Sequence, residues 1–196
     1  WRLRAARPQD ETPKSLARAS THVLATSATM CEAAAEEARL LGYDACILGL
    51  DLVGDAVPGG AAFARRLLDE ASGRALIAGG EMTVKLDSDA PPGAGGPSQE
   101  AALAAALELD GSGPACVLCM DSDGIDGPGH AAGGLIDDLT LGVARNAGVD
   151  VDTALAAHDS GTALDALGDL LVTGPTGTNV NDLKVGLRGR LRDGGR

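Results

Sequence analysis

Asp169-Leu-Leu-Val-Thr-Gly-Pro-Thr-Gly-Thr-Asn-Val-Asn-Asp182 joins a short apolar run to ten residues that lack a large side chain. The run Asp169 to Val172 predicts a strand, and the residues after it are too small and too polar to form core. Their glycines permit close backbone approach, and their hydroxyl, amide and carboxylate groups can hydrogen-bond a ligand. A turn whose Asn and Thr side chains bond their own backbone is the alternative for this loop by itself.

The pairing of an apolar run with a polar end recurs upstream of this loop. Short apolar runs lie at 21–26, 44–50, 74–78, 115–120 and 169–173. Ala-rich segments of helical period separate them, and helices are predicted at 28–41, 60–72, 98–109, 138–146, 151–158 and 160–167. This alternation predicts a three-layer α/β/α fold around a mostly parallel sheet.

Two segments indicate that the sheet is mixed. Residues 81–86 follow the 74–78 run after only Gly79-Gly80, which fits either a hairpin or one strand continuing through a kink. Residues 180–191 alternate weakly after a loop of turn length, and we expect them to run antiparallel to 169–173.

The chain is expected to form one packed unit. Residues 21–73 form an α/β segment that packs with residues 74–190, residues 1–20 are a linker or N-terminal extension, and residues 191–196 are a tail. The start at Trp1 rather than Met is typical of a segment from a longer protein.

The charge of the chain argues against two classes of partner. Its 28 acidic and 16 basic residues give a formal net charge of −12, which opposes binding to nucleic-acid phosphates and to anionic membranes. No apolar run approaches the roughly 20 residues needed to span a bilayer, and no apolar signal core is present. We therefore expect a cytoplasmic protein that binds neither nucleic acid nor membrane.

The Cys116-x-x-Cys119 spacing does not predict a zinc or redox site. Both residues lie in a predicted strand, where positions three apart point to opposite faces and cannot share a metal. No second Cys or His pair completes a tetrahedral set. We expect both cysteines to be core residues.

Polar loops follow three further predicted elements, at 79–83, 93–100 and 121–128. Ligands of open α/β sheets bind outside the carboxyl ends of strands. Free backbone N–H groups at the start of the helix 98–109 would bind a phosphate or carboxylate, unless the glycines there only connect two elements. Asp121, Asp123 and Asp126 are suited to a hard cation such as Mg²⁺, or alternatively to a turn stabilised by their own side chains.

His158-Asp159-Ser160 contains the residue types of a hydrolase triad. Neighbours in sequence rarely form one, because the three side chains must converge from different parts of a fold. We expect Asp159 or Ser160 to cap the helix that follows.

Taken in order, these segments resemble the MOFRL domain, the C-terminal part of the class II glycerate 2-kinases, many of which were first labelled hydroxypyruvate reductases. The resemblance covers about residues 74–190, and residues 22–54 look like the segment that precedes this domain in the same kinases. The residues that carry it are Gly79-Gly-Glu81, Gly95-Gly96 with Gln99-Glu100, Asp123-Gly-Ile-Asp-Gly-Pro128 with Ala131-Ala-Gly133, Asp159-Ser160, Gly168-Asp169 and Thr173–Asp182.

The resemblance implies transfer of the γ-phosphoryl group of ATP to the 2-hydroxyl of D-glycerate, with Mg²⁺. It implies a cleft shared with an N-terminal Rossmann-like domain that supplies a catalytic lysine, so that this segment alone would be inactive. Such chemistry depends on positioning and charge neutralisation, which polar loops can provide. The residues expected to contact substrate or phosphate are Glu81, Gly95, Gly96, Gln99, Thr176, Asn179, Asn181 and Asp182, and those expected to bind the metal are Asp123 and Asp126.

The chain departs from the family pattern at three places. Pro97 stands where the family usually has an arginine, Asp121-Ser122 where it has Gly-Thr, and His158 where it has Asn. Loss of the arginine would remove a positive charge that stabilises a phosphoryl-transfer transition state. A divergent paralogue or an altered substrate therefore stays open.

Two other functions remain alternatives. An NAD(P)H-dependent hydroxypyruvate reductase would need a Gly-x-Gly-x-x-Gly after a strand, which this chain lacks, although such a site could lie upstream. A non-catalytic module that binds glycerate or a nucleotide is the other alternative. The sequence leaves the oligomeric state open, a homodimer included.

Overall fold

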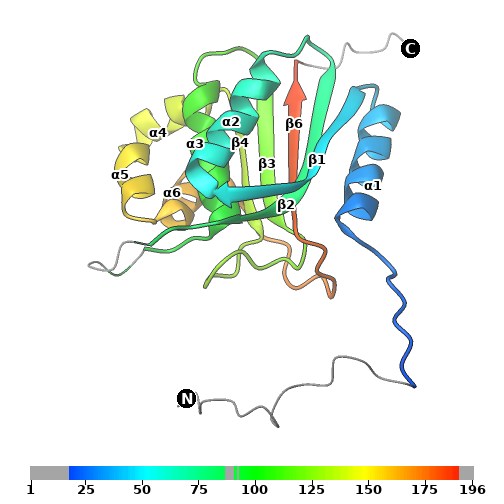
Figure 1. The fold of residues 1–196 in the computed structure, drawn as a ribbon. Coiled ribbons are helices and arrows are strands. Elements are labelled where there is room, and N and C mark those ends of the chain that lie inside the picture. Colours follow the sequence, from blue (N-terminus) through cyan, green and yellow to red (C-terminus); the bar gives the residue numbers. More distant parts are fainter. Residues whose placement is uncertain (1–17, 87–90, 92, 190–196) are drawn as a thin grey trace.

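The computed structural model describes residues 18–86, 91 and 93–189, which form a six-stranded mixed sheet between two layers of helices (Figure 1). The α/β class and the mixed sheet are confirmed. Residues 1–17 of the expected N-terminal extension, and the expected tail, lie outside the described residues.

The strands lie in the order β1-β2-β6-β3-β4-β5. They are β1 (Asp44–Asp55), β2 (Arg74–Thr83), β3 (Ala115–Asp121), β4 (Gly133–Asp137), β5 (Leu170–Leu171) and β6 (Asp182–Arg188). β1, β2, β3 and β5 share one direction, but β6 lies between β2 and β3, and β4 lies between β3 and β5. The parallel pairing expected from the alternating pattern therefore holds only for β1 with β2.

Helices cover both faces of the sheet, as expected for three layers. They are α1 (Ser27–Leu40), α2 (Ala56–Leu68), α3 (Pro97–Leu109), α4 (Thr140–Ala147), α5 (Val151–Ala156) and α6 (Ser160–Leu167). α1 packs on one face through Cys31 and Ala35, and the other helices lie on the opposite face (Figure 1). No helix in the described part of the chain is long and apolar enough to cross a membrane.

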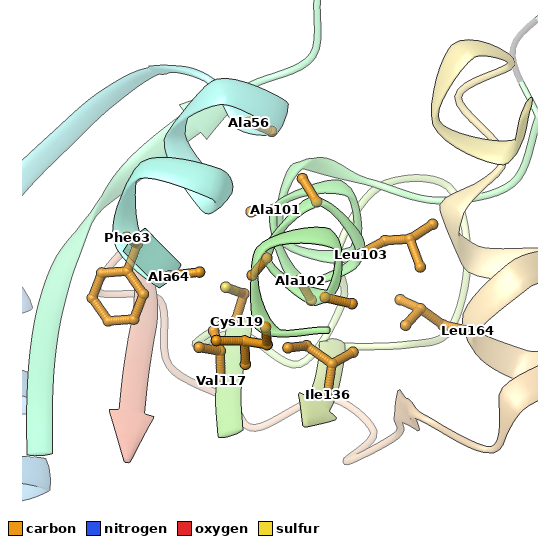
Figure 2. Packing of buried hydrophobic residues seen from close by; sticks show 14 of the residues in the cluster. Ala56, Phe63, Ala64, Ala101, Ala102, Leu103, Val117, Cys119, Ile136 and Leu164 are labelled. Carbon is orange, nitrogen blue, oxygen red and sulfur yellow. The ribbon is translucent and has the colours of Figure 1, made fainter. Parts of the chain in front are cut away.

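α3 lies at the centre of the larger core. Figure 2 shows Ala101 and Leu103 of this helix between α2, α6 and the strands that carry Val117 and Ile136. A Cβ atom at Gly60 of α2 would lie 2.0 Å from the carbonyl oxygen of Ala101, so only glycine allows the two helices to approach this closely. This packing holds the first turn of α3 firmly at one end of the sheet.

Four expectations about element positions were wrong. Residues 21–26 form no strand, because this exposed segment has no neighbouring strand to pair with. β6 is antiparallel as expected, but its partners are β2 and β3 instead of the strand at 170–171. β4 was not predicted, because its sequence Gly-Gly-Leu-Ile-Asp is typical of a turn. α2 begins at Ala56, ahead of its glycines, because Asp55 accepts a hydrogen bond from the Val57 amide and caps it.

The Gly79-Gly80 segment is a kink inside one strand and not a hairpin. β2 continues through both residues, and Gly80 has a φ of 141°, which a side chain would not tolerate. A Cβ atom there would also lie 2.2 Å from the carbonyl oxygen of Leu52 in β1. Beyond the kink, β2 pairs only with β1, where Glu81 lies opposite Val53, because its pairing with β6 ends at Gly80.

Candidate functional site

The polar loops gather at one end of the sheet. β2 and β3 end there and β6 begins there, because β6 is antiparallel to both. Asp182 is paired with Gly80 on one side and with Asp121 on the other. The loops that follow β3 and precede β6 lie together beyond this end of the sheet (Figure 1). Segments far apart in sequence are thereby brought to a single edge.

The loop 173–182 is hydrogen-bonded to the loop 121–128. The Thr176 hydroxyl donates to the carbonyl oxygen of Ser122 at 2.5 Å, and the Val180 amide donates to the Ser122 hydroxyl at 2.8 Å. The Asn179 side-chain amide donates to Asp123 Oδ2 at 3.3 Å. Some polar groups of the loop 173–182 are therefore used to hold it against the loop 121–128. Asn179 lies beside the Asp123 carboxylate.

Asp126 lies at the N-terminus of α3. Its side chain is buried, and its two oxygens accept from the backbone amides of Ser98 at 3.0 Å and Gln99 at 2.8 Å. The Gln99 side-chain amide donates to the same carboxylate at 3.0 Å. Burial raises the pKa of Asp126 to about 6, against the lowering effect of these hydrogen bonds. The helix terminus, which by sequence would either bind an external anion or only connect two elements, binds a carboxylate of this chain.

A buried ion pair lies beneath the loops. Lys184 Nζ donates to Asp182 Oδ2 at 2.7 Å, and both side chains are almost completely buried. The Met82 amide donates to the same oxygen at 3.4 Å. Both charged residues belong to β6, and the bond from the Met82 amide links Asp182 to β2. Removing one member of the pair would leave the other charge buried and unpaired.

A pocket of about 470 Å³ opens beside these loops. Glu81, Glu100 and His158 are its titratable lining residues, and Gly95 and Gly96 contribute backbone. Its remaining lining is mostly apolar, from residues that include Met82, Val84, Leu86 and Pro97. A mostly apolar wall with a few convergent polar groups is the usual make-up of a small-molecule site.

Glu100 and His158 form a hydrogen-bonded pair at the wall of this pocket. His158 Nδ1 lies 2.9 Å from Glu100 Oε1, and the exposed fractions of the two side chains are 24% and 3%. Burial raises the pKa of Glu100, and the hydrogen bond and charge of His158 oppose that rise. His158 adopts a φ of 52°, a left-handed conformation that is uncommon for residues other than glycine.

The residues predicted to contact substrate or phosphate fall into three groups. Glu81, Gly95 and Gly96 line the pocket. Thr176, Asn179 and Asn181 lie on the loop that adjoins Asp123. Gln99 and Asp182 are buried and bonded to Asp126 and Lys184, so they support the site from below. Direct ligand contact by these eight residues stays a prediction.

The two predicted metal ligands differ in their surroundings. Asp123 accepts from the Ile125 amide at 2.8 Å and from Asn179. Burial raises the pKa of the neighbouring Asp121 carboxyl, the hydrogen bond from the Asp123 amide opposes that rise, and the charge of the Asp123 carboxylate adds to it. Both oxygens of Asp126 are instead occupied by α3. Among the described residues, no three His, Cys, Asp or Glu side chains are grouped so that they could hold a metal ion. Mg²⁺ commonly takes only one or two carboxylates and completes its coordination with phosphates and water, and Asp123 with Asp121 fits that pattern.

Three features of the site were missed or misjudged from the sequence. Lys184 was not singled out. It lies two residues from Asp182 and two from Gly186, so the three residues share the buried face of β6, and this spacing was the available signal for a buried lysine. The pairing of Glu100 with His158 spans 58 residues and has no local signal. The capping of α3 by Asp126 was missed, because nothing near Asp126 in sequence indicates contact with a helix 28 residues earlier, and its metal binding stays a prediction.

The sequence of the chain is similar to a known family and to several known proteins. Residues 74–182 match the MOFRL family. The chain is 39% identical over 173 residues to the glycerate 2-kinase of Pyrococcus horikoshii, which amounts to 84% of this chain and 38% of that relative. A relative from Agrobacterium vitis is 40% identical over 188 residues, 92% of this chain and 43% of its own length, and carries the provisional name of a hydroxypyruvate reductase.

A solved structure gives the same result for the fold. The crystal structure of a glycerate kinase from Thermotoga maritima matches with a TM-score of 0.83 and 36% sequence identity, over 90% of this chain and 44% of that chain. The chain spans about two fifths of the length of these relatives. The family match and the identities together show that this chain belongs to the MOFRL family.

Proposed function

We propose that this chain is the C-terminal region of a glycerate 2-kinase, which phosphorylates D-glycerate at its 2-hydroxyl and uses ATP as the donor. The observation that carries the proposal is the gathering of polar loops at one end of the sheet, in a chain 39% identical to a glycerate 2-kinase. Residues from the segments 79–83, 93–100 and 121–128 line one pocket there, and the loop 173–182 is hydrogen-bonded to the segment 121–128. The product is 2-phosphoglycerate, and ADP is released.

The arrangement suits phosphoryl transfer because that reaction depends on positioning and charge neutralisation. In this proposal Glu81, at the pocket, and Asp123, beside Asn179, orient the substrate and its counter-ion, and the loop 173–182 donates hydrogen bonds to oxygen atoms of glycerate or phosphate. Asp126 and the Asp182–Lys184 pair hold these loops in position. The chain thereby supplies one wall of a cleft.

Mg²⁺ and ATP complete the proposed site. Asp123, with Asp121 beside it, would hold Mg²⁺, which when bound neutralises charge on the transferred phosphoryl group. The other wall of the cleft, with a catalytic lysine, would come from an N-terminal Rossmann-like domain of the same protein. We therefore expect the chain by itself to be inactive, and its partners to be small molecules and that domain.

A paired assay on the whole reading frame that contains this chain tests the proposal. ADP release with D-glycerate, ATP and Mg²⁺ is measured beside NAD(P)H oxidation with hydroxypyruvate. Glycerate-dependent ADP release with formation of 2-phosphoglycerate is the expected result. Its absence would overturn the proposal, and NAD(P)H oxidation in its place would establish the reductase named for the Agrobacterium vitis relative.

A further inference from the structure

Ser122 bonds the loop 173–182 with its hydroxyl, its carbonyl and its amide group. The hydroxyl oxygen accepts from the Val180 amide at 2.8 Å, and the carbonyl oxygen accepts from the Thr176 hydroxyl at 2.5 Å. The Ser122 amide donates to the carbonyl oxygen of Asn181 at 3.2 Å. Ser122 is 6% exposed, so it holds the loop from beneath and is itself closed to a ligand.

Hydrogen bonds to the segment around Ser122 give this loop its shape. Residues 173–181 are mostly exposed, and none of them, all within the described part of the chain, belongs to a hydrophobic core. A Cβ atom at Gly124 would lie 2.1 Å from the carbonyl oxygen of Gly174, so the two loops approach as closely as glycine allows. Hydrogen bonding, and not the packing of apolar side chains, therefore fixes the loop.

The bond from Val180 lies between two residues that are predicted to contact substrate or phosphate, Asn179 and Asn181. The Asn179 side-chain amide donates to Asp123 Oδ2 at 3.3 Å, and its side-chain oxygen accepts from the Asn181 amide at 3.2 Å. Asn181 has a φ of 69°, a left-handed conformation that persists where the surroundings hold it. Because Ser122 bonds both Val180 and Asn181, it fixes the backbone that directs the two asparagine side chains.

On the basis of the proposed function, we infer that Ser122 is a positioning residue for phosphoryl transfer. Its hydroxyl sets the positions of Asn179 and Asn181 relative to Asp123, and it touches neither substrate nor metal. In a reaction that depends on positioning, a displacement of about 1 Å can cost about 100-fold in rate. The buried hydroxyl of Ser122 thereby acts on turnover through the loop 173–182.

Amide hydrogen exchange of the whole reading frame tests the first step, without any ligand. Ser122→Ala removes the acceptor of the Val180 amide, and we expect exchange in the segment 173–182 to become about tenfold faster. Ser122→Thr keeps a hydroxyl oxygen and should keep slow exchange. Ser112→Ala is the matched control, since the Ser112 hydroxyl bonds the Gly113 carbonyl before the start of β3, at the other end of that strand.

Turnover in the same variants tests the second step. Ser122→Ala should lower kcat for glycerate-dependent ADP release by about tenfold, and Ser122→Thr should restore it. Asn179→Ala combined with Ser122→Ala should lose less than the product of the two single losses, because Ser122 acts through Asn179. Urea unfolding of each variant shows whether a loss of kcat follows a loss of stability. Ser112→Ala should keep the wild-type rate.

The outcomes separate this inference from the proposed function. Faster exchange in Ser122→Ala, with losses of kcat that do not multiply and are restored by threonine, supports the inference. Unchanged exchange, an unchanged kcat, losses that multiply, or a loss of kcat that only follows lower stability overturns the role of Ser122 alone. A wild type without glycerate-dependent ADP release overturns both.

Discussion

Asp126 and Glu100 are two carboxylates that meet the first turn of α3, and both are almost fully buried. The oxygens of Asp126 accept hydrogen bonds from backbone amides and from Gln99, which are fixed donors. Glu100 instead faces His158 at the wall of a pocket. Burial raises the pKa of both, so the hydrogen-bond partner, and not burial, distinguishes the carboxylate that caps a helix from the one at a pocket wall.

The largest effect is expected from removing the carboxylate of Asp126. Asp126→Ala leaves the Ser98 and Gln99 amides without an acceptor and should lower the free energy of unfolding by about 3 kcal/mol. Urea unfolding of the purified chain measures this change. Asp123→Ala is the control and should cost less than about 1 kcal/mol, since Asp123 is only half-buried and the hydrogen bonds that it accepts lie at the surface. Equal losses in the two variants would remove the distinction between capping and site carboxylates.

The pH dependence of stability should report the same carboxylate. Native Asp126 titrates at about 6 and its reference value is 3.8, so between these values the folded chain binds a proton that the unfolded chain has released. The contribution of Asp126 to the free energy of unfolding is therefore fully present below pH 3.8 and is lost as the pH rises to about 6. The total loss is at most about 3 kcal/mol.

Comparison of the wild type with Asp126→Asn isolates this effect from other carboxylates. The wild-type advantage in unfolding free energy, measured by urea unfolding between pH 4 and 7, should shrink as the pH rises. A difference that stays constant with pH would show that Asp126 is ionised throughout.

A smaller effect, on turnover, is expected at Asp123. Asp123→Ala in the whole reading frame should lower kcat by about tenfold, because the loop carboxylate beside Asn179 no longer positions the phosphate counter-ion. Asn179→Ala should act in the same direction. Asp152→Ala removes an exposed carboxylate on α5 and should leave ADP release unchanged. Wild-type kinetics in Asp123→Ala would exclude this residue from the site.

Much of the fold was predictable because its signals are local. The strands at 44–55, 74–83 and 115–121 and five of the helices follow from apolar runs and helical periodicity. Strand order was not predictable, because the insertion of β6 between β2 and β3 depends on pairing across more than 60 residues. β4 was hidden since its two glycines, typical of turns, allow close packing against Cys119 and Ala102.

The sequence by itself determined that small polar residues follow buried strands, that the chain is acidic, and that its loops resemble those of glycerate 2-kinases. Spacing along the chain carries that information. Tertiary structure alone decided which carboxylates are free to act. Asp123 and Asp126 are three residues apart, yet only Asp126 meets the N-terminus of α3, while His158 acquires its partner from a helix 58 residues away. Burial and hydrogen bonding set the chemistry of these groups, and both depend on contacts between elements that are distant in sequence.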